Sequence, residues 1–141
     1  MSEFRLVSFH HGEQRYLVDA MRVVSVLRGE ALEPVDGVRA PFSHRIRHDD
    51  AWVPVIDFRS AAFDDRPRGL PVLLCRVGAG LVGLWVDSVD GVCTATPESL
   101  SPGARADRPF SLGTCETPEV SGLLFDVVAA VQPEVSLPRP P

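Results

Sequence analysis

Short stretches of alternating or continuous apolar residues run along most of this chain, and their length is typical of β-strands. Over residues 4–9, Phe4, Leu6 and Ser8 alternate with Arg5, Val7 and Phe9. The run His-Gly-Glu at 11–13 contains turn residues, and residues 15–18 resume an apolar run. The same order returns later, with apolar residues 72–77, the turn Gly-Ala-Gly at 78–80 and a continuous apolar run at 81–86. The pattern predicts two β-hairpins, the second with a buried strand.

The two hairpins belong to an internal repeat. When the chain is shifted by 68 residues, the segment 4–43 matches 72–111 with 11 identities in 40 ungapped positions, where composition alone gives about two or three. The matches include Leu6 with Leu74, Val24 with Val92, and the triplet Pro-Phe-Ser at 41–43 with the same triplet at 109–111. After one inserted residue, 55–58 fall opposite 124–127. Two half-chain units of one architecture are therefore expected.

The repeat also predicts the remaining elements. Residues 44–48 and 52–58 flank a turn at 49–50, and their counterparts 113–117 and 120–126 flank a turn at 118–119. Asp19 and Asp87 each follow an apolar run, where an Asp can cap a single helical turn. The proline-containing stretches 30–34 and 98–102 are expected to be connections. About five short strands per half suit a small barrel, which hides its strand edges.

These elements predict an all-β chain of two five-stranded barrels side by side, with short helical turns. The first subdomain spans about residues 4–59, a linker rich in charged residues and breakers covers 60–71, and the second subdomain spans about 72–132 and ends in a short helix. The proline-rich tail at 133–141 is expected to be disordered. Each half alone, at about 60 residues, would be marginally stable, so the two halves are expected to pack together.

Composition narrows the classes of function. The chain has 141 residues, is 45% hydrophobic, and carries a formal charge of −5. No basic stripe with interleaved aromatic residues is present, which argues against a nucleic-acid partner. The three cysteines belong to no CxxC pair, which favours a reducing compartment. The N-terminus lacks the pattern of a signal peptide, and no apolar run is long enough to span a membrane. A cytoplasmic protein is expected.

The candidate chemical groups each have a simpler structural interpretation. His44 and His48 could bind a metal from one face of a helix, but on the predicted strand they lie about 13 Å apart. Cys75 lies in an apparently buried strand, where thiols are usually inert. Asp57 and Asp126 occupy equivalent positions in the repeat, which favours a capping or turn role over catalysis. His10 and His11 are expected to be exposed at a hairpin tip. No catalytic site, metal site or cofactor is predicted.

Three sequence blocks together resemble the CheW-like domain. They are LVSFHHGEQRYLVDAMRVV at residues 6–24, VPVIDFR at 53–59 and LVGLWVDSVDGV at 81–92, and the similarity covers residues 4–131. The resemblance implies two SH3-like barrels and a bacterial adaptor of the chemosensory signal-transduction pathway, without catalytic activity or cofactor. The implied partners are the regulatory domain of a CheA-type histidine kinase, the cytoplasmic tip of a chemoreceptor, and other CheW-like proteins.

The resemblance also implies positions of partner contact. The family's GVINLRG-like run corresponds to residues 44–50, so that its first glycine falls on His44 and its receptor-contacting arginine on Asp49, unless a two-residue shift places Arg47 there. The VxEV-type turn corresponds to residues 23–26, which places Val23 in the motif and Ser25 where an acidic residue is usual. Trp52, beside a polar turn, is a candidate anchor for a partner. An accessory protein that binds only the receptor or only the kinase is the alternative function.

Overall fold

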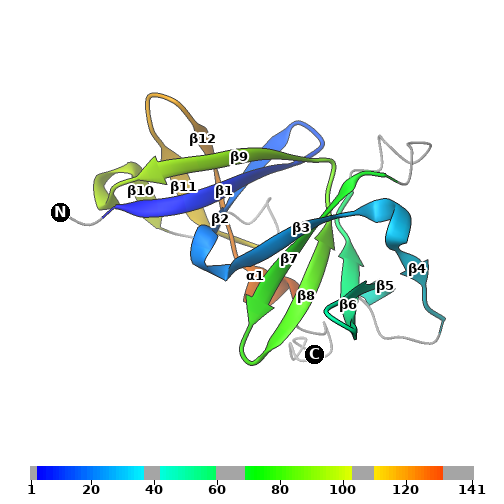
Figure 1. Cartoon of the computed structure of the whole chain (residues 1–141). Coiled ribbons are helices and arrows are strands. Elements are labelled where there is room, and N and C mark those ends of the chain that lie inside the picture. Colours follow the sequence, from blue (N-terminus) through cyan, green and yellow to red (C-terminus); the bar gives the residue numbers. More distant parts are fainter. Residues whose placement is uncertain (1–2, 37–41, 60–68, 103–109, 132–141) are drawn as a thin grey trace, which may run out of the picture.

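The computed structural model describes residues 3–36, 42–59, 69–102 and 110–131, and it folds into two six-stranded sheets (Figure 1). Sheet A has the order β10 (Leu100–Pro102), β11 (Ser111–Glu116), β12 (Ser121–Phe125), β2 (Gln14–Asp19), β1 (Phe4–His11) and β9 (Ser88–Ala95). Sheet B has the order β3 (Val23–Arg28), β7 (Pro71–Val77), β8 (Gly80–Trp85), β6 (Ala51–Asp57), β5 (Phe42–His48) and β4 (Glu33–Pro34). The all-β prediction and both predicted hairpins are confirmed.

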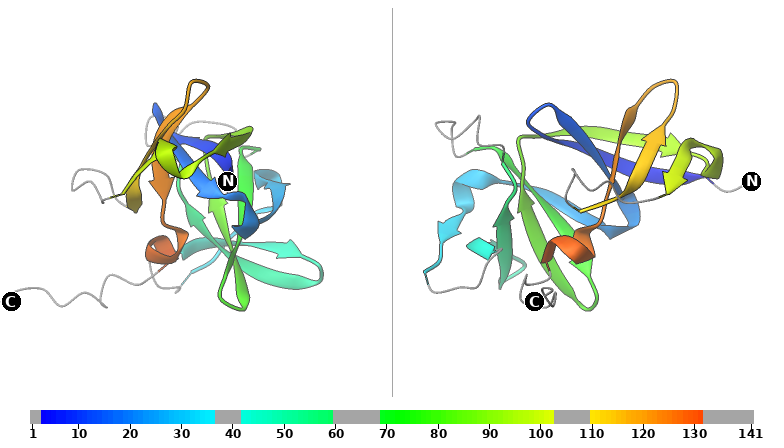
Figure 2. Two further views of the ribbon diagram at one scale, coloured as in Figure 1. Left: turned by 90° about the vertical axis from the view of Figure 1, so that its left-hand side faces the viewer. Right: turned by 180° about the vertical axis from the view of Figure 1, so that it is seen from behind.

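Each sheet contains strands from both halves of the chain. The β1–β2 hairpin joins the strands β9 to β12, while the β7–β8 hairpin joins β3 to β6. The exchange occurs because only the 3₁₀ turn η1 (Ala20–Arg22) separates β2 from β3, and only two residues separate β8 from β9. Figure 2 shows the β1–β2 hairpin between β12 and β9. The predicted division at residues 60–71 thus describes the sequence repeat and not the membership of either sheet.

The strand pairing corrects the register of the repeat. His11 and Gln14 flank the turn of the first hairpin, and Val77 and Gly80 flank that of the second, so equivalent positions of the two hairpins lie 66 residues apart and not 68. A bulge at the same equivalent place, in the β3–β7 and β1–β9 pairs, supports this register. In this part of the chain the predicted shift was wrong by two residues, because a shift of two residues keeps each side chain on the same side of the sheet. Farther along, the 3₁₀ turns at 29–31 and 97–99 and the paired residues Pro34 and Pro102 keep the predicted spacing of 68. In β5–β6 and β11–β12 the spacing is 69, as the sequence predicted.

An apolar core between the sheets holds the exchanged hairpins in place. Phe9 and Tyr16 come from the β1–β2 hairpin and contact Phe125 with ring centroids 5.2 and 5.4 Å apart. Phe58, which follows β6, also contacts Phe125, at 5.3 Å. Phe9 is fully buried, and such ring pairs contribute about 0.5–1.5 kcal/mol each beyond the area they bury. Two smaller apolar clusters lie within the separate sheets.

Several local predictions can be compared with the structure. Asp19 caps η1, since its carboxylate accepts a hydrogen bond from the backbone N–H of Met21 at 2.9 Å. Asp87 caps no helical turn, because β9 begins directly after it; its carboxylate accepts from the backbone N–H of Gly12 instead. The predicted connections 30–34 and 98–102 contain the short strands β4 and β10 and the 3₁₀ turns η2 (Gly29–Ala31) and η4 (Pro97–Ser99).

The two histidines at the first hairpin are half-buried and not exposed. His10 Nδ1 lies 2.6 Å from a carboxylate oxygen of Asp90, and His11 Nδ1 lies 3.0 Å from the carbonyl oxygen of Phe58. The start of β9 and the residue after β6 therefore contact the hairpin end that the sequence placed in solvent. The predicted C-terminal helix is present as α1 (Val127–Val131), whereas residues 60–68 and the tail 133–141 lie outside the described residues. None of the described helices is long and apolar enough to cross a membrane.

Replacing Val86 by Asp tests the core between the sheets. Val86 is fully buried there, and a carboxylate at this position has no partner, which costs several kcal/mol. We expect Val86→Asp to abolish the cooperative thermal transition measured by circular dichroism. The control Val92→Asp, at a side chain that is 65% exposed, should melt within a few degrees of the parent. A folded Val86→Asp protein with the parent's transition would contradict the assignment of the core.

Candidate functional site

A groove of about 380 Å³ opens on sheet B and is the candidate functional site. It is formed by β3, the β5–β6 hairpin and the β7–β8 hairpin, which are distant in sequence and adjacent in the sheet. Its lining is mainly apolar, with charged or titratable side chains on both hairpins: Val24, His48, Asp49, Ala51, Trp52, Val53, Arg76, Ala79, Gly80 and Leu81. Two of the six residues predicted as contacts, Asp49 and Trp52, lie in this lining.

Trp52 is the largest exposed side chain of the groove. It is 40% exposed, and the guanidinium carbon of Arg45 lies 3.8 Å from its ring centroid. Arg47 lies opposite Trp52 in the strand pairing, with its guanidinium carbon 5.3 Å from the same ring. Such contacts at exposed sites contribute about 0.5–1 kcal/mol each. They fix the orientation of the indole and give this part of the surface a combined aromatic and cationic character.

Asp49 lies at the tip of the β5–β6 hairpin. Asp49 and Asp50 both have positive φ, at 50° and 63°, which is the geometry of a type I′ turn. The Asp49 side chain is 90% exposed, and its carboxylate is 3.4 Å from His48 Nε2. The turn therefore projects a negative charge from the edge of the groove, at the position where the resemblance implies an arginine.

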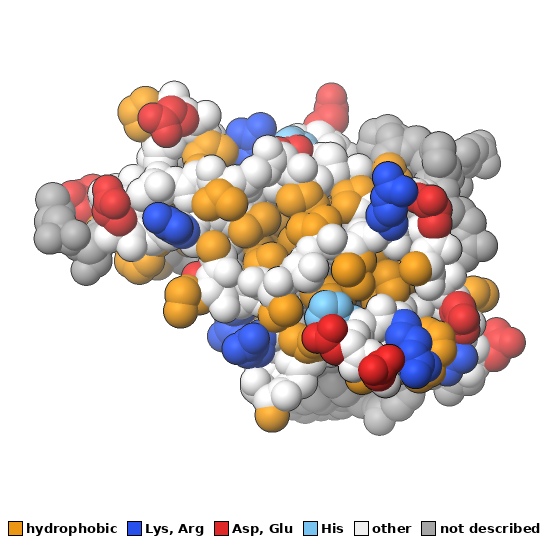
Figure 3. All heavy atoms as spheres, viewed as in Figure 1, with side chains coloured by type: hydrophobic (Ala, Val, Ile, Leu, Met, Phe, Trp, Pro, Cys, Tyr) orange, Lys and Arg blue, Asp and Glu red, His pale blue; other side chains and the backbone are white. Residues whose placement is uncertain are grey.

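Strand β3 presents different residues to solvent from those the motif indicated. Val23 is partly buried against the core between the sheets, and Ser25 is half-buried beside a bulge in the β3–β7 pairing. The exposed apolar positions of this strand are Val24 and Val26, at 37% and 48%. The sequence did not distinguish them, because both faces of the run Val-Val-Ser-Val-Leu carry apolar residues. Figure 3 shows hydrophobic side chains gathered across the middle of this face, with charged groups at its margins.

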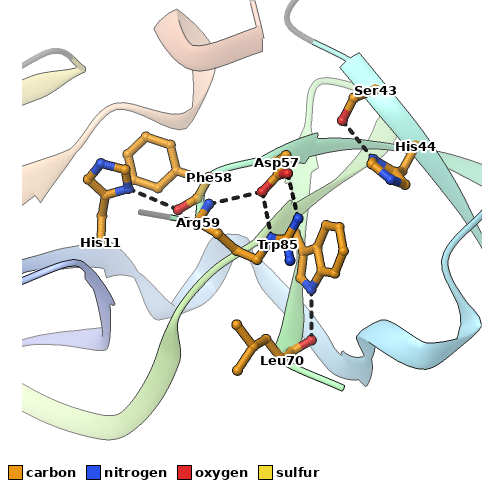
Figure 4. A network of polar contacts seen from close by, with 8 residues as sticks. All are labelled: His11, Ser43, His44, Asp57, Phe58, Arg59, Leu70 and Trp85. Atoms are coloured by element: carbon orange, nitrogen blue, oxygen red, sulfur yellow. Dashed lines mark hydrogen bonds and ion pairs between the residues drawn. The ribbon is translucent and has the colours of Figure 1, made fainter. Parts of the chain in front are cut away.

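His44 lies in a separate cluster away from the groove lining. Its ring is edge-on to that of Trp85, at 5.1 Å, and its Nδ1 lies 2.8 Å from the hydroxyl of Ser43 (Figure 4). His48 lines the groove, so the two histidines have different surroundings. Among the described residues, no group of three or more His, Cys, Asp or Glu side chains is arranged to hold a metal ion.

Asp57 and Arg59 complete the cluster around Trp85. The Arg59 guanidinium donates two hydrogen bonds to the Asp57 carboxylate, at 2.9 and 2.8 Å, and lies 3.3 Å from the Trp85 ring centroid (Figure 4). The indole N–H of Trp85 donates to the carbonyl of Leu70 at 3.0 Å. Burial raises the pKa of Asp57, but the hydrogen bonds and charge of Arg59 outweigh it and hold that pKa below its usual value. The predicted turn-bonding role of Asp57 is confirmed.

The thiol of Cys75 fits its predicted inert role. Its side chain is fully buried between the sheets, and burial raises its pKa to about 12, so it stays protonated at neutral pH. Asp126 caps α1, accepting a hydrogen bond from the backbone N–H of Ala129 at 3.0 Å, which confirms the role predicted for it.

The groove on sheet B, described above, has a mainly apolar lining with charged side chains at its edges. Such a surface suits recognition of another protein.

Comparisons with known proteins agree with the fold. The model of the CheW-like domain family matches residues 5–134. The crystal structure of the scaffolding protein TtCheW from Thermoanaerobacter tengcongensis aligns with a TM-score of 0.75 and 19% sequence identity, covering 88% of this chain and 89% of that one. At this identity the structural match shows the fold, and the predicted fold class is confirmed. A search of curated proteins found no match.

The Asp57–Arg59 pair gives a pH-dependent prediction. Because the pKa of Asp57 is lower in the folded than in the unfolded chain, its contribution to stability is present above the unfolded pKa and is lost as the pH falls through the folded one. We expect Asp57→Asn to reduce the free energy of unfolding by about 1–2 kcal/mol at pH 7, a value that allows for partial exposure.

Urea denaturation at several pH values measures this effect. The difference between parent and Asp57→Asn should shrink below about pH 4, where the parent's carboxylate becomes protonated. Glu33→Gln is the matched control, because the Glu33–Arg45 ion pair is largely exposed and its loss should cost less than about 0.5 kcal/mol. A difference that stays constant from pH 7 to pH 3 would show that the ionised pair does not stabilise the fold.

Proposed function

Because this chain belongs to the CheW-like domain family, we propose that it is a non-enzymatic, cytoplasmic adaptor of a bacterial chemosensory system. In this role it couples the cytoplasmic tip of a chemoreceptor to the regulatory domain of a CheA-type histidine kinase. The observation that carries the proposal is the groove on sheet B, where Trp52 and Asp49 meet the exposed face of β3. Three separate elements supply a continuous surface of apolar and charged groups there.

The physical character of the groove supports a protein partner. Val24 and Val26 are partly exposed on β3, and Trp52 is held by two arginines, so an apolar partner surface would bury all three side chains. An oriented, partly exposed tryptophan is a frequent energetic centre of protein interfaces. Arg76 and Asp49 at the margins can pair with opposite charges on the partner and set its orientation.

Coupling in such an adaptor is geometric. The aromatic core between the sheets fixes the relative positions of their outer faces, so a partner bound to one sheet is held at a defined angle to a partner bound to the other. A small shift in one partner can then change the contacts of the other. The free energy of that change is the coupling between the two binding sites.

One observation favours the alternative of an accessory protein that binds a single partner. Asp49 is 90% exposed where the resemblance implies a receptor-contacting arginine, and Ser25 stands where an acidic residue is usual. Reversed or missing charges at an interface cost up to a few kcal/mol. An accessory protein would act as a spacer, competitor or insulator.

Separate binding measurements distinguish the two functions. The purified chain is tested by calorimetry against a receptor cytoplasmic fragment and against a kinase regulatory domain. Binding to both supports the coupling adaptor, and binding to one supports the accessory protein. Binding to neither at concentrations near 100 µM, about −5.5 kcal/mol, would refute both.

Trp52→Ala tests the groove directly. Loss of a central aromatic side chain should weaken binding of the partner that occupies the groove by about tenfold to a hundredfold, with little change in thermal stability. Phe4→Ala is the matched control, because Phe4 is 39% exposed and lies on sheet A. Equal affinities of the parent and Trp52→Ala for both partners would place the interface elsewhere.

Asp49→Asn tests the charge at the hairpin tip. Asparagine tolerates positive φ, so the variant removes the charge and keeps the turn. We expect receptor binding to strengthen a few-fold, with a smaller gain at high salt. Asp50→Asn, the next residue of the same turn, is the control for a general change in net charge. No change on Asp49→Asn, or an equal change on Asp50→Asn, would contradict a specific contact.

A further inference from the structure

A second hollow, of about 210 Å³, lies on sheet A beside α1 and is separate from the groove on sheet B. Its walls are the apolar side chains of Leu6, Leu17 and Leu124, and the carboxyl groups of Asp19 and Asp126 stand at its margin. Pockets for drug-sized ligands begin near about 300 Å³, so this hollow suits a single large side chain.

Sheet B shows what occupies the equivalent place. In the parallel pairing of β6 with β8, Val55 lies opposite Gly83, and in that of β12 with β2, Leu124 lies opposite Leu17. The pairings have the same register under the spacings of 66 and 69 residues established above. Asp126 is therefore the counterpart of Asp57, and Asp19 is that of Trp85. Val128, two residues after Asp126, is the counterpart of Arg59.

The two equivalent places differ in what fills them. In sheet B the indole of Trp85 is 2% exposed, and the guanidinium of Arg59 covers it while binding Asp57 through two hydrogen bonds. In sheet A the carboxylate at the Asp57 position is kept, while the tryptophan and the arginine are replaced by shorter side chains. Sheet B thus shows which groups fit at this place in the fold: an aromatic ring, and a cation that stacks on the ring and pairs with an aspartate.

The charges of the sheet A hollow favour a cationic group. Asp19 and Asp126 each use one carboxylate oxygen as a helix cap, and no described residue donates a hydrogen bond to the second oxygen of either. The one basic residue in the lining, Arg22, donates instead to the backbone carbonyl of Arg76 at 3.1 Å. Two carboxylates against one cation leave the hollow with a net negative charge.

Two exposed apolar side chains also belong to the lining of the hollow. Leu112 is 52% exposed and Val128 36%, and both lie in its lining. Exposed apolar side chains around a hollow are typical of a surface that a partner covers. An aromatic ring in the hollow would bury both, and a cation beside the ring would reach the carboxylates.

We propose that the sheet A hollow is a docking site for a segment of another protein that carries an exposed aromatic side chain with an arginine close to it in sequence. The aromatic ring occupies the place that Trp85 fills in sheet B, and the guanidinium pairs with Asp126 and Asp19 as Arg59 pairs with Asp57. The site is independent of the groove on sheet B, so a partner bound there leaves that groove open.

Three capped tripeptides test this site on the full chain: Trp-Ser-Arg, Trp-Ser-Glu and Ala-Ser-Arg. Methyl chemical shifts of Leu112, Leu124 and Val128 are followed by NMR during each titration. We expect saturable shifts at these methyl groups with Trp-Ser-Arg, and affinity at least about tenfold weaker for the other two. Equal affinity of the three peptides, or shifts confined to other residues, would overturn the proposal.

Variants of the chain test separately the pairing of the arginine with the carboxylates and the binding of the aromatic ring in the hollow. Asp19→Asn keeps a residue able to cap η1 and removes one carboxylate, so it should bring the affinity for Trp-Ser-Arg toward that for Trp-Ser-Glu. Val128→Phe fills the hollow and should abolish binding in a protein whose thermal transition is unchanged. Glu116→Gln, on the exposed side of β11, is the control for charge and should leave binding unaltered. Binding that survives Asp19→Asn undiminished would remove the electrostatic part of the proposal.

A second copy of this chain is the competing occupant, because Trp52 with Arg45 and Arg47 has the same chemistry. Sedimentation velocity at increasing protein concentration distinguishes the two. A monomer at all concentrations supports a separate partner. Self-association that is lost in both Trp52→Ala and Val128→Phe would identify the second copy as the occupant and overturn the assignment to another protein.

Discussion

The exchange of hairpins between the two sheets is the constraint on which the rest of the structure depends. Neither sheet can form from one half of the chain, because β1 and β2 complete the sheet of the second half and β7 and β8 complete that of the first. The rings of Phe9 and Tyr16 contact Phe125 in the core between the sheets, and these contacts hold the β1–β2 hairpin in its place. Long-range pairing of this kind orders distant segments together, so the two halves are expected to unfold as one cooperative unit.

This arrangement leaves the outer faces of both sheets available and fixes them relative to each other. Sheet B carries the groove around Trp52, and sheet A carries the hollow beside α1. The duplicated architecture makes the two surfaces comparable position by position, although their residues have diverged. In sheet B the buried side chain of Trp85 occupies the place at the end of β8. In sheet A the equivalent residue is Asp19, whose shorter side chain leaves a hollow. One duplicated fold thus carries two hollows with different linings, one on each sheet.

Much of the fold followed from local patterns. The two hairpins, the cap at Asp19, the turn at residues 49–50 and the cap at Asp126 were predicted because each depends on a few neighbouring residues. The candidate site was predicted less completely. Trp52 and Asp49 do meet in one groove, but Val24, Arg76 and Leu81 come from strands whose adjacency no local pattern encodes. His44 was grouped with them by motif alone, whereas its ring packs against Trp85 in a different cluster.

The sequence by itself determined that the chain is duplicated and all-β, because hydrophobic periodicity and turn residues act over a few positions, and its three motif blocks resemble the CheW-like domain. Only the tertiary structure decided which half supplies each hairpin, the two-residue correction in the repeat, and which valines of β3 face solvent. A shift of two residues leaves every side chain on the same side of its strand, so the apolar pattern is equally satisfied in both registers. The choice between them is made by the positions of the two hairpin turns and by the bulged pairings β1–β9 and β3–β7.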